Sequence, residues 1–317
     1  MAETTAPSSN LGQAVQALRD FTQGTSDGTW RVRPLDQGEQ ATVFVAESRN
    51  QDQSQTRDPV VIKLYRLASP TQGEFVCRQF DSMSRAHAAL SGRTFDGWRI
   101  STPIPLHVCR SPLALVMTMV PGTKVSRYLR PGGDLAHDLA AMVPPAIIAA
   151  MSEYWRAGQS HGDFNFDNIL LEPTTRQISF VDFDMPPLIP CGDGAARWHP
   201  ASYDLGYMLY DVAMQVKSDS IGPVARDRRL TLAERVLCVF LESETGHENR
   251  LHLIDEIQAI ARFHLETIDV SLSPRGLWRR ALRWLAARRI DATLGRLRAR
   301  CVPATCAPLA DQLARRQ

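Results

Sequence analysis

Two short polar segments carry side chains that could do chemistry together. The segment "HGDFNFDNILL" at 161–171 and the segment "ISFVDFDMPP" at 178–187 both contain β-branched, Leu or Ile residues next to acids, which predicts a hairpin. Such a hairpin would bring four oxygen-bearing side chains to one edge of a cleft: Asp163, Asn168, Asp182 and Asp184. Three carboxylates repel one another unless a cation lies between them. Carboxylate and amide oxygens suit Mg²⁺, which completes its shell with water and substrate phosphates.

The elements that must position these side chains change character along the chain. Residues 29–48 and 59–67 are rich in Val, Ile, Thr and aromatic residues, which predicts antiparallel strands. Residues 72–90 carry apolar side chains at helical intervals, and residues 114–122 resemble a buried strand that ends in a Pro-Gly turn. The remainder is mainly helical except around 160–190. This order predicts an α+β fold of two lobes.

The spacing of the polar residues resembles the signature of protein-kinase-like phosphotransferases. The pattern is Asp-x-x-x-x-Asn, followed 14 residues later by an Asp that comes after an apolar strand. The "HGD" at 161–163, in place of "HRD", is similar to the aminoglycoside phosphotransferase and choline kinase branch. The resemblance covers roughly residues 30–215. It implies a bilobal fold with an antiparallel-sheet N-lobe and a mainly helical C-lobe.

In this resemblance the two polar segments hold the reacting groups. Asp163 corresponds to the base that receives the hydroxyl proton of the acceptor. Asn168 and Asp182 correspond to the ligands of Mg²⁺. Asp184 is a further candidate ligand, because "DFD" stands where protein kinases have "DFG".

The strand-rich region corresponds to the nucleotide-binding lobe. The resemblance places Lys63, in "VVIKLYR", at the α- and β-phosphates and Gly38 in the turn of the strand pair that covers the nucleotide. Met119 and its neighbours lie where the hinge binds adenine through backbone groups. The acid that pairs with Lys63 is either Glu74 or Asp81, and we favour Glu74 because its side chain is longer. The implied co-substrate is ATP or GTP, with Mg²⁺.

Three more residues correspond to the frame of the catalytic loop. His161 would hold the loop through its backbone and ring, and Gly162 would supply the turn before the base. Asp204, in "ASYDLGYMLYDVA", would begin a buried helix and tie the loop down.

The predicted organisation has four parts. They are a tail and helix at 1–28, a nucleotide-binding N-lobe at 29–121, a C-lobe with the catalytic and metal-binding loops at 122–270, and a basic helical extension at 271–317. The expected activity is that of a kinase, an ATP- and Mg²⁺-dependent phosphotransferase that phosphorylates a hydroxyl of a small molecule, with an amino sugar or other saccharide as a candidate. Two alternatives remain: a kinase of a glycan or lipid-linked sugar at the membrane surface, and a catalytically inactive nucleotide-binding scaffold.

The formal charge of +2 conceals an uneven distribution. Residues 271–317 hold 11 Arg and two acids, which is +9 and leaves 2 − 9 = −7 for residues 1–270. Within 273–289 one helical face is apolar and Arg279, Arg280 and Arg283 lie opposite; the face comprises Leu277, Trp278, Ala281, Leu282, Trp284 and Leu285. This helix either contacts a membrane surface or packs its apolar face on the C-lobe, and we favour packing. Nucleic-acid binding is not indicated, because no reader module accompanies the Arg residues.

The segment 233–258 carries six acids against two Arg. These acids either line a pocket for a cationic amine or form a solvated helix face, and we favour the solvated face. No apolar stretch approaches the roughly 20 residues of a membrane-spanning helix, and the start of the chain lacks the pattern of a signal peptide. We therefore expect a cytoplasmic protein. The basic helix suggests the alternative of peripheral contact with the inner face of the membrane.

Overall fold

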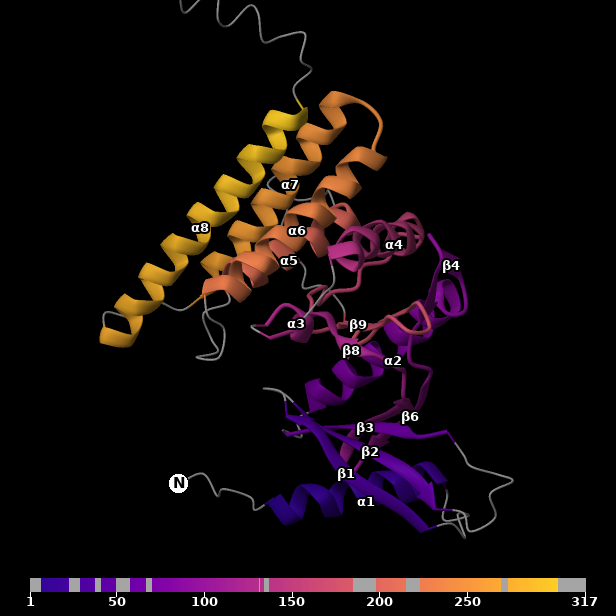
Figure 1. Ribbon diagram of the computed structural model, residues 1–317. Helices are drawn as coiled ribbons and strands as arrows, with labels where there is room; N and C mark the ends of the chain where they lie inside the picture. Colours follow the sequence, from indigo (N-terminus) through magenta and orange to yellow (C-terminus); the bar gives the residue numbers. More distant parts are fainter. Residues whose placement is uncertain are drawn as a thin grey trace, which may run out of the picture. The chain divides into compact units, whose positions relative to one another are not determined.

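The chain divides into two compact units, which we describe separately (Figure 1). The computed structural model describes residues 7–22, 29–37, 41–49, 58–66, 70–130, 132–133, 137–184, 198–214, 223–268 and 273–301. The first unit comprises Met1–Arg93, Ile100–Gly122 and Ser179–Met185, and the second comprises Thr94–Arg99, Thr123–Ile178 and Pro186–Gln317. An antiparallel sheet dominates one unit and helices dominate the other. The predicted α+β class is confirmed.

The first unit is an antiparallel sheet that carries helices. Its elements are α1 (Pro7–Thr22), β1 (Thr29–Gln37), β2 (Ala41–Arg49), β3 (Val60–Tyr65), α2 (Pro70–Leu90), β6 (Pro105–Arg110) and β7 (Leu113–Thr118). The strands lie in the order β1-β2-β3-β7-β6, and each neighbouring pair is antiparallel.

Strand β3 shows why the two helices contact opposite sides of this sheet. Successive side chains of a strand point to opposite faces. One face of β3 joins a buried core with α1, made of Val60, Ile62, Leu64, Ala14 and Leu18. The other face carries Lys63 and Tyr65, and the Tyr65 ring meets the edge of Phe75 from α2 at a centroid distance of 6.3 Å. Lys63 therefore lies on the side of the sheet that α2 covers.

The rest of the chain supplies most of the helices and a second sheet, also of five strands. Its elements are β4 (Thr94–Phe95), β5 (Trp98–Ser101), β8 (Thr123–Lys124), α3 (Val125–Tyr128), α4 (His137–Arg156), β9 (Ile169–Glu172), β10 (Gln177–Phe180), α5 (Pro200–Met214), α6 (Pro223–Ser243), α7 (His247–Glu266) and α8 (Pro274–Cys301). The second sheet has the order β4-β5-β10-β9-β8. Nowhere in the described ranges is a helix both long enough and apolar enough to cross a membrane.

Helix α5 forms the centre of the helical unit. Ten of its 15 residues are buried, so it contacts neighbours on most of its surface. At Gly206 an added Cβ would come within 2.8 Å of the Ile260 Cβ and 2.9 Å of the Ile257 carbonyl oxygen. The absence of a side chain at this position lets α5 approach α7 closely.

Helix α8 packs on this unit through a different face from the one that the sequence suggested. The buried positions are Ala286, Ile290, Leu294 and Leu297. Leu277, Trp278, Trp284 and Leu285 are exposed, so the prediction that this face packs on the C-lobe is wrong for these four side chains. Figure 1 shows the first turns of α8 extending beyond the other helices of the bundle.

The acids of 233–258 contact neighbouring elements of the same unit. Glu234 lies 2.6 Å from Arg296, and Asp255 lies 2.5 Å from Arg298. The Ser202 hydroxyl donates to Glu256 over 2.7 Å. The second half of the basic helix α8 therefore forms ion pairs with acidic residues of α6 and α7.

Candidate active site

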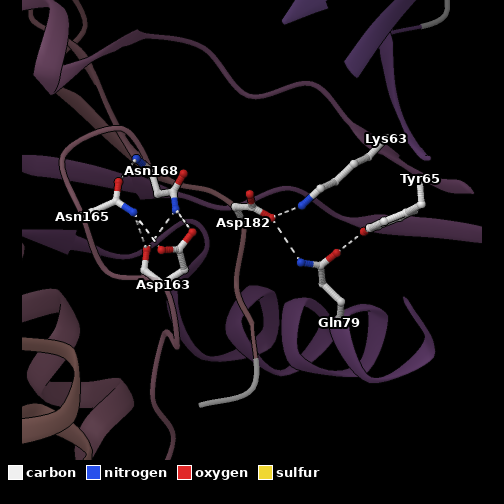
Figure 2. A network of polar contacts seen from close by, with 7 residues as sticks. All are labelled: Lys63, Tyr65, Gln79, Asp163, Asn165, Asn168 and Asp182. Carbon is white, nitrogen blue, oxygen red and sulfur yellow. Dashed lines mark hydrogen bonds and ion pairs between the residues drawn. The ribbon is translucent and has the colours of Figure 1, made fainter. Parts of the chain in front are cut away.

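In the first unit, Lys63 of β3 forms an ion pair with Asp182, which follows β10 (Figure 2). The contact joins Nζ of Lys63 to Oδ1 of Asp182, two residues that are 119 positions apart in the chain. The Lys63 side chain is largely buried, with 15% of its surface exposed, whereas Asp182 is 37% exposed. Within the pair, the Asp182 side chain is therefore more exposed to solvent than the Lys63 side chain.

Gln79 of α2 completes this cluster, and the sequence analysis missed it. Its Nε2 donates to Asp182 Oδ1 over 3.1 Å, and its Oε1 accepts a hydrogen bond from the Tyr65 hydroxyl. Figure 2 shows Lys63 and Gln79 converging on the Asp182 carboxylate. A signal was present, because Gln79 precedes the apolar Met83 by four residues and therefore shares its buried helix face.

Glu74 and Asp81, the two acids considered for Lys63, are both exposed on α2. The expected pairing with Glu74 is not the one the structure shows, since Lys63 pairs with Asp182. Helical geometry gives the reason. Glu74 and Asp81 lie seven residues apart on one face, and that face is the exposed one. The length of the Glu side chain could not compensate for its direction.

The charges of this cluster favour protonated Lys63. Burial lowers the pKa of the Lys63 ammonium, but the carboxylates of Asp182 and Asp184 and the nearby Tyr65 raise it, and the pKa ends above its ordinary value. Burial also raises the pKa of the Tyr65 hydroxyl, which therefore stays a donor. Asp184 thus acts here as an electrostatic neighbour of Lys63.

The backbone at Asp182 is in an unusual conformation. Its φ of 63° lies in the left-handed region, which non-glycine residues adopt rarely and Asp more readily than most. Such conformations cost on the order of 1 kcal/mol or more and persist where the surroundings hold them. The Lys63 and Gln79 contacts supply that constraint.

In the second unit, the loop before β9 holds Asp163 and Asn168 against each other. Asn168 Nδ2 lies 2.8 Å from Asp163 Oδ2 and 2.9 Å from the Asp163 carbonyl oxygen. Asn165 donates to Asp163 Oδ1 over 2.9 Å, and its own Oδ1 accepts the backbone N–H of Asp167 and Asn168. The sequence analysis did not assign Asn165 a role. The available signal was the position of Asn165 between two apolar residues, Phe164 and Phe166, which are both buried.

Asp204 of α5 ties the start of this loop down. Its fully buried carboxylate accepts the backbone N–H of His161 over 2.7 Å and of Gly162 over 3.0 Å. The indole N–H of Trp155 donates to it over 2.7 Å. Burial raises the pKa of Asp204 to about 7, although these three donors oppose the rise. Gly162 has φ 84°, a conformation that suits the turn before Asp163.

Two further side chains of this unit contact the loop. The hydroxyl of Tyr207, from α5, donates to Asp163; burial first, and then this carboxylate, raise the pKa of Tyr207. The Ser126 hydroxyl of α3 donates to Asp167 over 2.5 Å. Asp163 therefore faces the amide donors of its own loop and the hydroxyl donor of Tyr207, which hold the direction of its carboxylate.

Two sequence-predicted nucleotide contacts, at Gly38 and Met119, stay predictions. Gly38 lies outside the described residues. Met119 follows β7; its side chain is 40% exposed and its backbone N–H donates to the Pro59 carbonyl over 3.1 Å. The adenine contact therefore stays a prediction.

The donor groups fit a hard cation such as Mg²⁺. Because both hydrogen bonds to Asp163 require the amide nitrogen of Asn168, its Oδ1 is the atom left for a cation. In the first unit, the Asp182 carboxylate separately offers oxygens of the kind that Mg²⁺ prefers. No group of three or more His, Cys, Asp or Glu in the described ranges is arranged to hold a metal by itself. A Mg²⁺ ion bound to either group would complete its shell with water and substrate phosphates, as Mg²⁺ commonly does.

Comparisons with known proteins add little to this geometry. No protein-family model matches the chain, and no curated protein matches it. Among solved structures, the chain is similar to a cysteine-to-alanine mutant of the PknI kinase domain of Mycobacterium tuberculosis. The TM-score is 0.43 at 15% identity, over 73% of this chain and 95% of that one. A likeness at this level carries no argument about activity, and the site is assigned from its own contacts.

Proposed function

We propose that this chain is a nucleotide- and Mg²⁺-dependent phosphotransferase that transfers a phosphoryl group to a hydroxyl of a small molecule. The observation that carries the proposal is the Asp163–Asn168 pair, held at 2.8 Å on a loop that the buried Asp204 fixes. A base beside an oxygen ligand for a cation, on one rigid loop, is the arrangement that phosphoryl transfer requires. Lys63 and Asp182 of the first unit supply the second part of the proposed machinery.

Each residue has a distinct role in this proposal. Asp163 orients the acceptor hydroxyl and accepts its proton, and the amides of Asn165 and Asn168 set the direction of its carboxylate. Lys63 supplies a positive charge for the nucleotide phosphates. Mg²⁺, when bound, would neutralise charge on the phosphates, held by Asn168 and Asp182, with Asp184 as a further candidate ligand. ATP or GTP is the proposed phosphoryl donor.

We propose only the chemical class of the acceptor, which is a hydroxyl compound such as an amino sugar or other saccharide. The acids of α6 and α7 do not favour a cationic acceptor in particular, since Glu234 and Asp255 form ion pairs with α8. The inactive scaffold is the competing proposal. It differs by binding a nucleotide without turnover.

Thermal shift with ATP or GTP, each with and without Mg²⁺, tests the nucleotide site. A ligand at about 100 times its Kd stabilises the folded state by about 2.7 kcal/mol. We expect a Mg²⁺-dependent shift in the wild type that is lost in Asp182→Ala and kept in Asp81→Ala, a matched control with an exposed carboxylate. No shift with either nucleotide in the wild type would contradict the proposal. Release of ADP or GDP with a panel of hydroxyl acceptors then separates the enzyme from the scaffold.

A further inference from the structure

The first half of α8 exposes a cluster of large apolar side chains. Leu277, Trp278, Trp284 and Leu285 are 55%, 59%, 57% and 39% exposed. Nine large hydrophobic residues are exposed in the described part of the chain, and these four lie within nine consecutive positions. Single exposed hydrophobic residues are ordinary, but a contiguous group indicates an interaction surface.

This cluster is not needed to hold α8 in place. The helix packs on its own unit through Ala286, Ile290, Leu294 and Leu297, which are buried. The exposed residues 277, 278, 284 and 285 are separated by one, six, seven or eight positions, so they form a stripe on a different face. We call this stripe, with the Arg residues of the same turns, the α8 surface: Leu277, Trp278, Arg279, Arg280, Arg283, Trp284, Leu285 and Arg288.

The charges along α8 differ between its two halves. In the second half, Arg296 and Arg298 form ion pairs with Glu234 and Asp255. In the first half, the Arg288 guanidinium stacks over the Trp284 ring, 4.9 Å from its centroid. Residues 274–290 contain six Arg and no acid. The positive charge of this half therefore accompanies the exposed apolar stripe.

A depression of about 430 Å³ between α7 and α8 adjoins this stripe. Arg280, Arg283 and Trp284 line it from α8, and Arg262 and Glu266 line it from α7. Arg262 also binds Asp291 over 2.8 Å. Three guanidinium groups against one lining carboxylate suit a phosphate-bearing group, because guanidinium hydrogen-bonds phosphate through two N–H groups at once.

We infer that the α8 surface docks on the face of a bilayer that contains anionic phospholipid. Trp278, Trp284 and the two Leu side chains enter the interfacial region, and Arg280 and Arg283 contact headgroup phosphates. Trp is the residue type that membrane interfaces favour, and a helix with an apolar stripe and flanking Arg lies on such a surface without crossing it.

The alternatives account for less of this surface. A nucleic acid would engage the Arg residues but give Leu277 and Leu285 no apolar partner. A second copy of the chain, packed through the same surface, would bring Arg280 and Arg283 near the same residues of its partner, and like charges repel. An anionic bilayer matches both the apolar and the charged side chains.

Vesicle co-sedimentation of the full chain tests the inference. Vesicles of phosphatidylcholine alone are compared with vesicles of phosphatidylcholine and phosphatidylglycerol. We expect binding to the anionic vesicles only, weakened by salt, with a blue shift of Trp fluorescence. The double variants Trp278→Ala/Trp284→Ala and Arg280→Glu/Arg283→Glu should each lower the affinity at least about tenfold, which corresponds to 1.4 kcal/mol.

Matched controls separate a local effect from a general one. Leu35→Ala/Met142→Ala removes exposed apolar side chains elsewhere, and Arg78→Glu/Arg110→Glu makes the same change of charge away from α8. Both should bind vesicles as the wild type does. All substituted residues are exposed except Arg283, which is half-buried, and an unchanged thermal midpoint verifies that each variant folds. Equal loss of binding in the controls overturns the inference.

Three other outcomes would also overturn it. They are equal binding to both kinds of vesicle, displacement from anionic vesicles by millimolar inorganic phosphate at constant ionic strength, and a dimer in light scattering that Trp278→Ala/Trp284→Ala dissociates. Binding to duplex DNA or RNA in place of vesicles would favour nucleic acid. The inference does not depend on the proposed phosphotransferase activity. Sedimentation is measured without nucleotide, and Asp163→Asn should bind vesicles normally.

Discussion

The Asn168 Nδ2 atom lies 2.8 Å from Asp163 Oδ2 and 2.9 Å from the Asp163 carbonyl oxygen. One amide group thus holds both the side chain and the backbone of the proposed base. Asn165 donates to the same residue, so the carboxylate direction is fixed from two sides. The first two predictions follow from this relationship.

Asp163→Asn should lower turnover by about 10²- to 10⁴-fold, the range typical for removal of a positioned acid or base. The Mg²⁺-dependent thermal shift with nucleotide should remain, because this variant keeps the size of the side chain and the proposed metal ligands. Initial rates with an identified acceptor, alongside the thermal shift, provide the measurement. Full activity in this variant would mean that another group serves as the base.

Asn168→Asp should disturb the loop by placing a second carboxylate against Asp163. Two carboxylates at hydrogen-bond distance cannot both ionise freely, so one pKa rises and the amide donor is lost. We expect lower turnover at neutral pH and a higher Mg²⁺ concentration for half-maximal rate. A Mg²⁺ titration of the initial rate measures both, and an unchanged titration would separate Asn168 from the proposed metal site.

Gln79→Ala should destabilise the first unit by about 1–3 kcal/mol, since it leaves the Tyr65 hydroxyl without its acceptor and removes a donor to Asp182. Glu74→Ala and Asp81→Ala are matched controls on the exposed face of the same helix and should stay within about 0.5 kcal/mol of the wild type. Urea unfolding gives the three values. A larger loss of stability in Glu74→Ala than in Gln79→Ala would revive the pairing that the sequence suggested.

Asp204→Asn should cost about 1–3 kcal/mol of unfolding free energy, because one of three N–H donors would then face an amide nitrogen. Asp227→Asn, an exposed position on α6, is the control and should change little. The Asp204 pKa of about 7 in the folded chain, against 3.8, means that the folded state binds a proton the unfolded state has released. Stability from this group therefore falls as pH rises from about 4 to 7, and Asp204→Asn should lack that slope.

His264→Phe should change the pH dependence of stability in the opposite sense. Burial lowers the pKa of His264 from 6.5 to about 4, and the rings of Tyr207 and Tyr210 lie 5.0 and 5.3 Å from its ring. Between those pH values the unfolded chain binds a proton that the folded chain does not, so wild-type stability from this group falls as pH falls. The loss approaches about 3 kcal/mol at most.

The comparison with His264→Phe isolates this effect, since Asp204 contributes the opposite slope in nearly the same range and both proteins retain it. Urea unfolding at neutral pH and near pH 4.5 gives the difference between the two proteins. Parallel profiles for the wild type and His264→Phe would show that His264 titrates at an ordinary pKa.

The sequence alone determined the order and type of the elements that hold the site. The strands at 29–48 and 59–67, the helix that follows them and the helix-rich remainder were all predicted, because alternation and helical spacing are local properties of the chain. The roles of Asp163, Asn168 and Asp204 were predicted because their spacing matches the motif that the chain resembles. The structure puts the first two in contact and ties the third to the loop that contains them.

Tertiary structure decided which side chains meet across the sequence. Lys63 pairs with Asp182 across 119 positions and not with Glu74, and the residue of α2 that contacts the same carboxylate is Gln79. Likewise, which face of α8 is buried depends on the surfaces of its neighbours. Local patterning fixes which residues of a helix share a face. Only the packing of other elements fixes which face is turned inward, because burial is a relation between segments far apart in the chain.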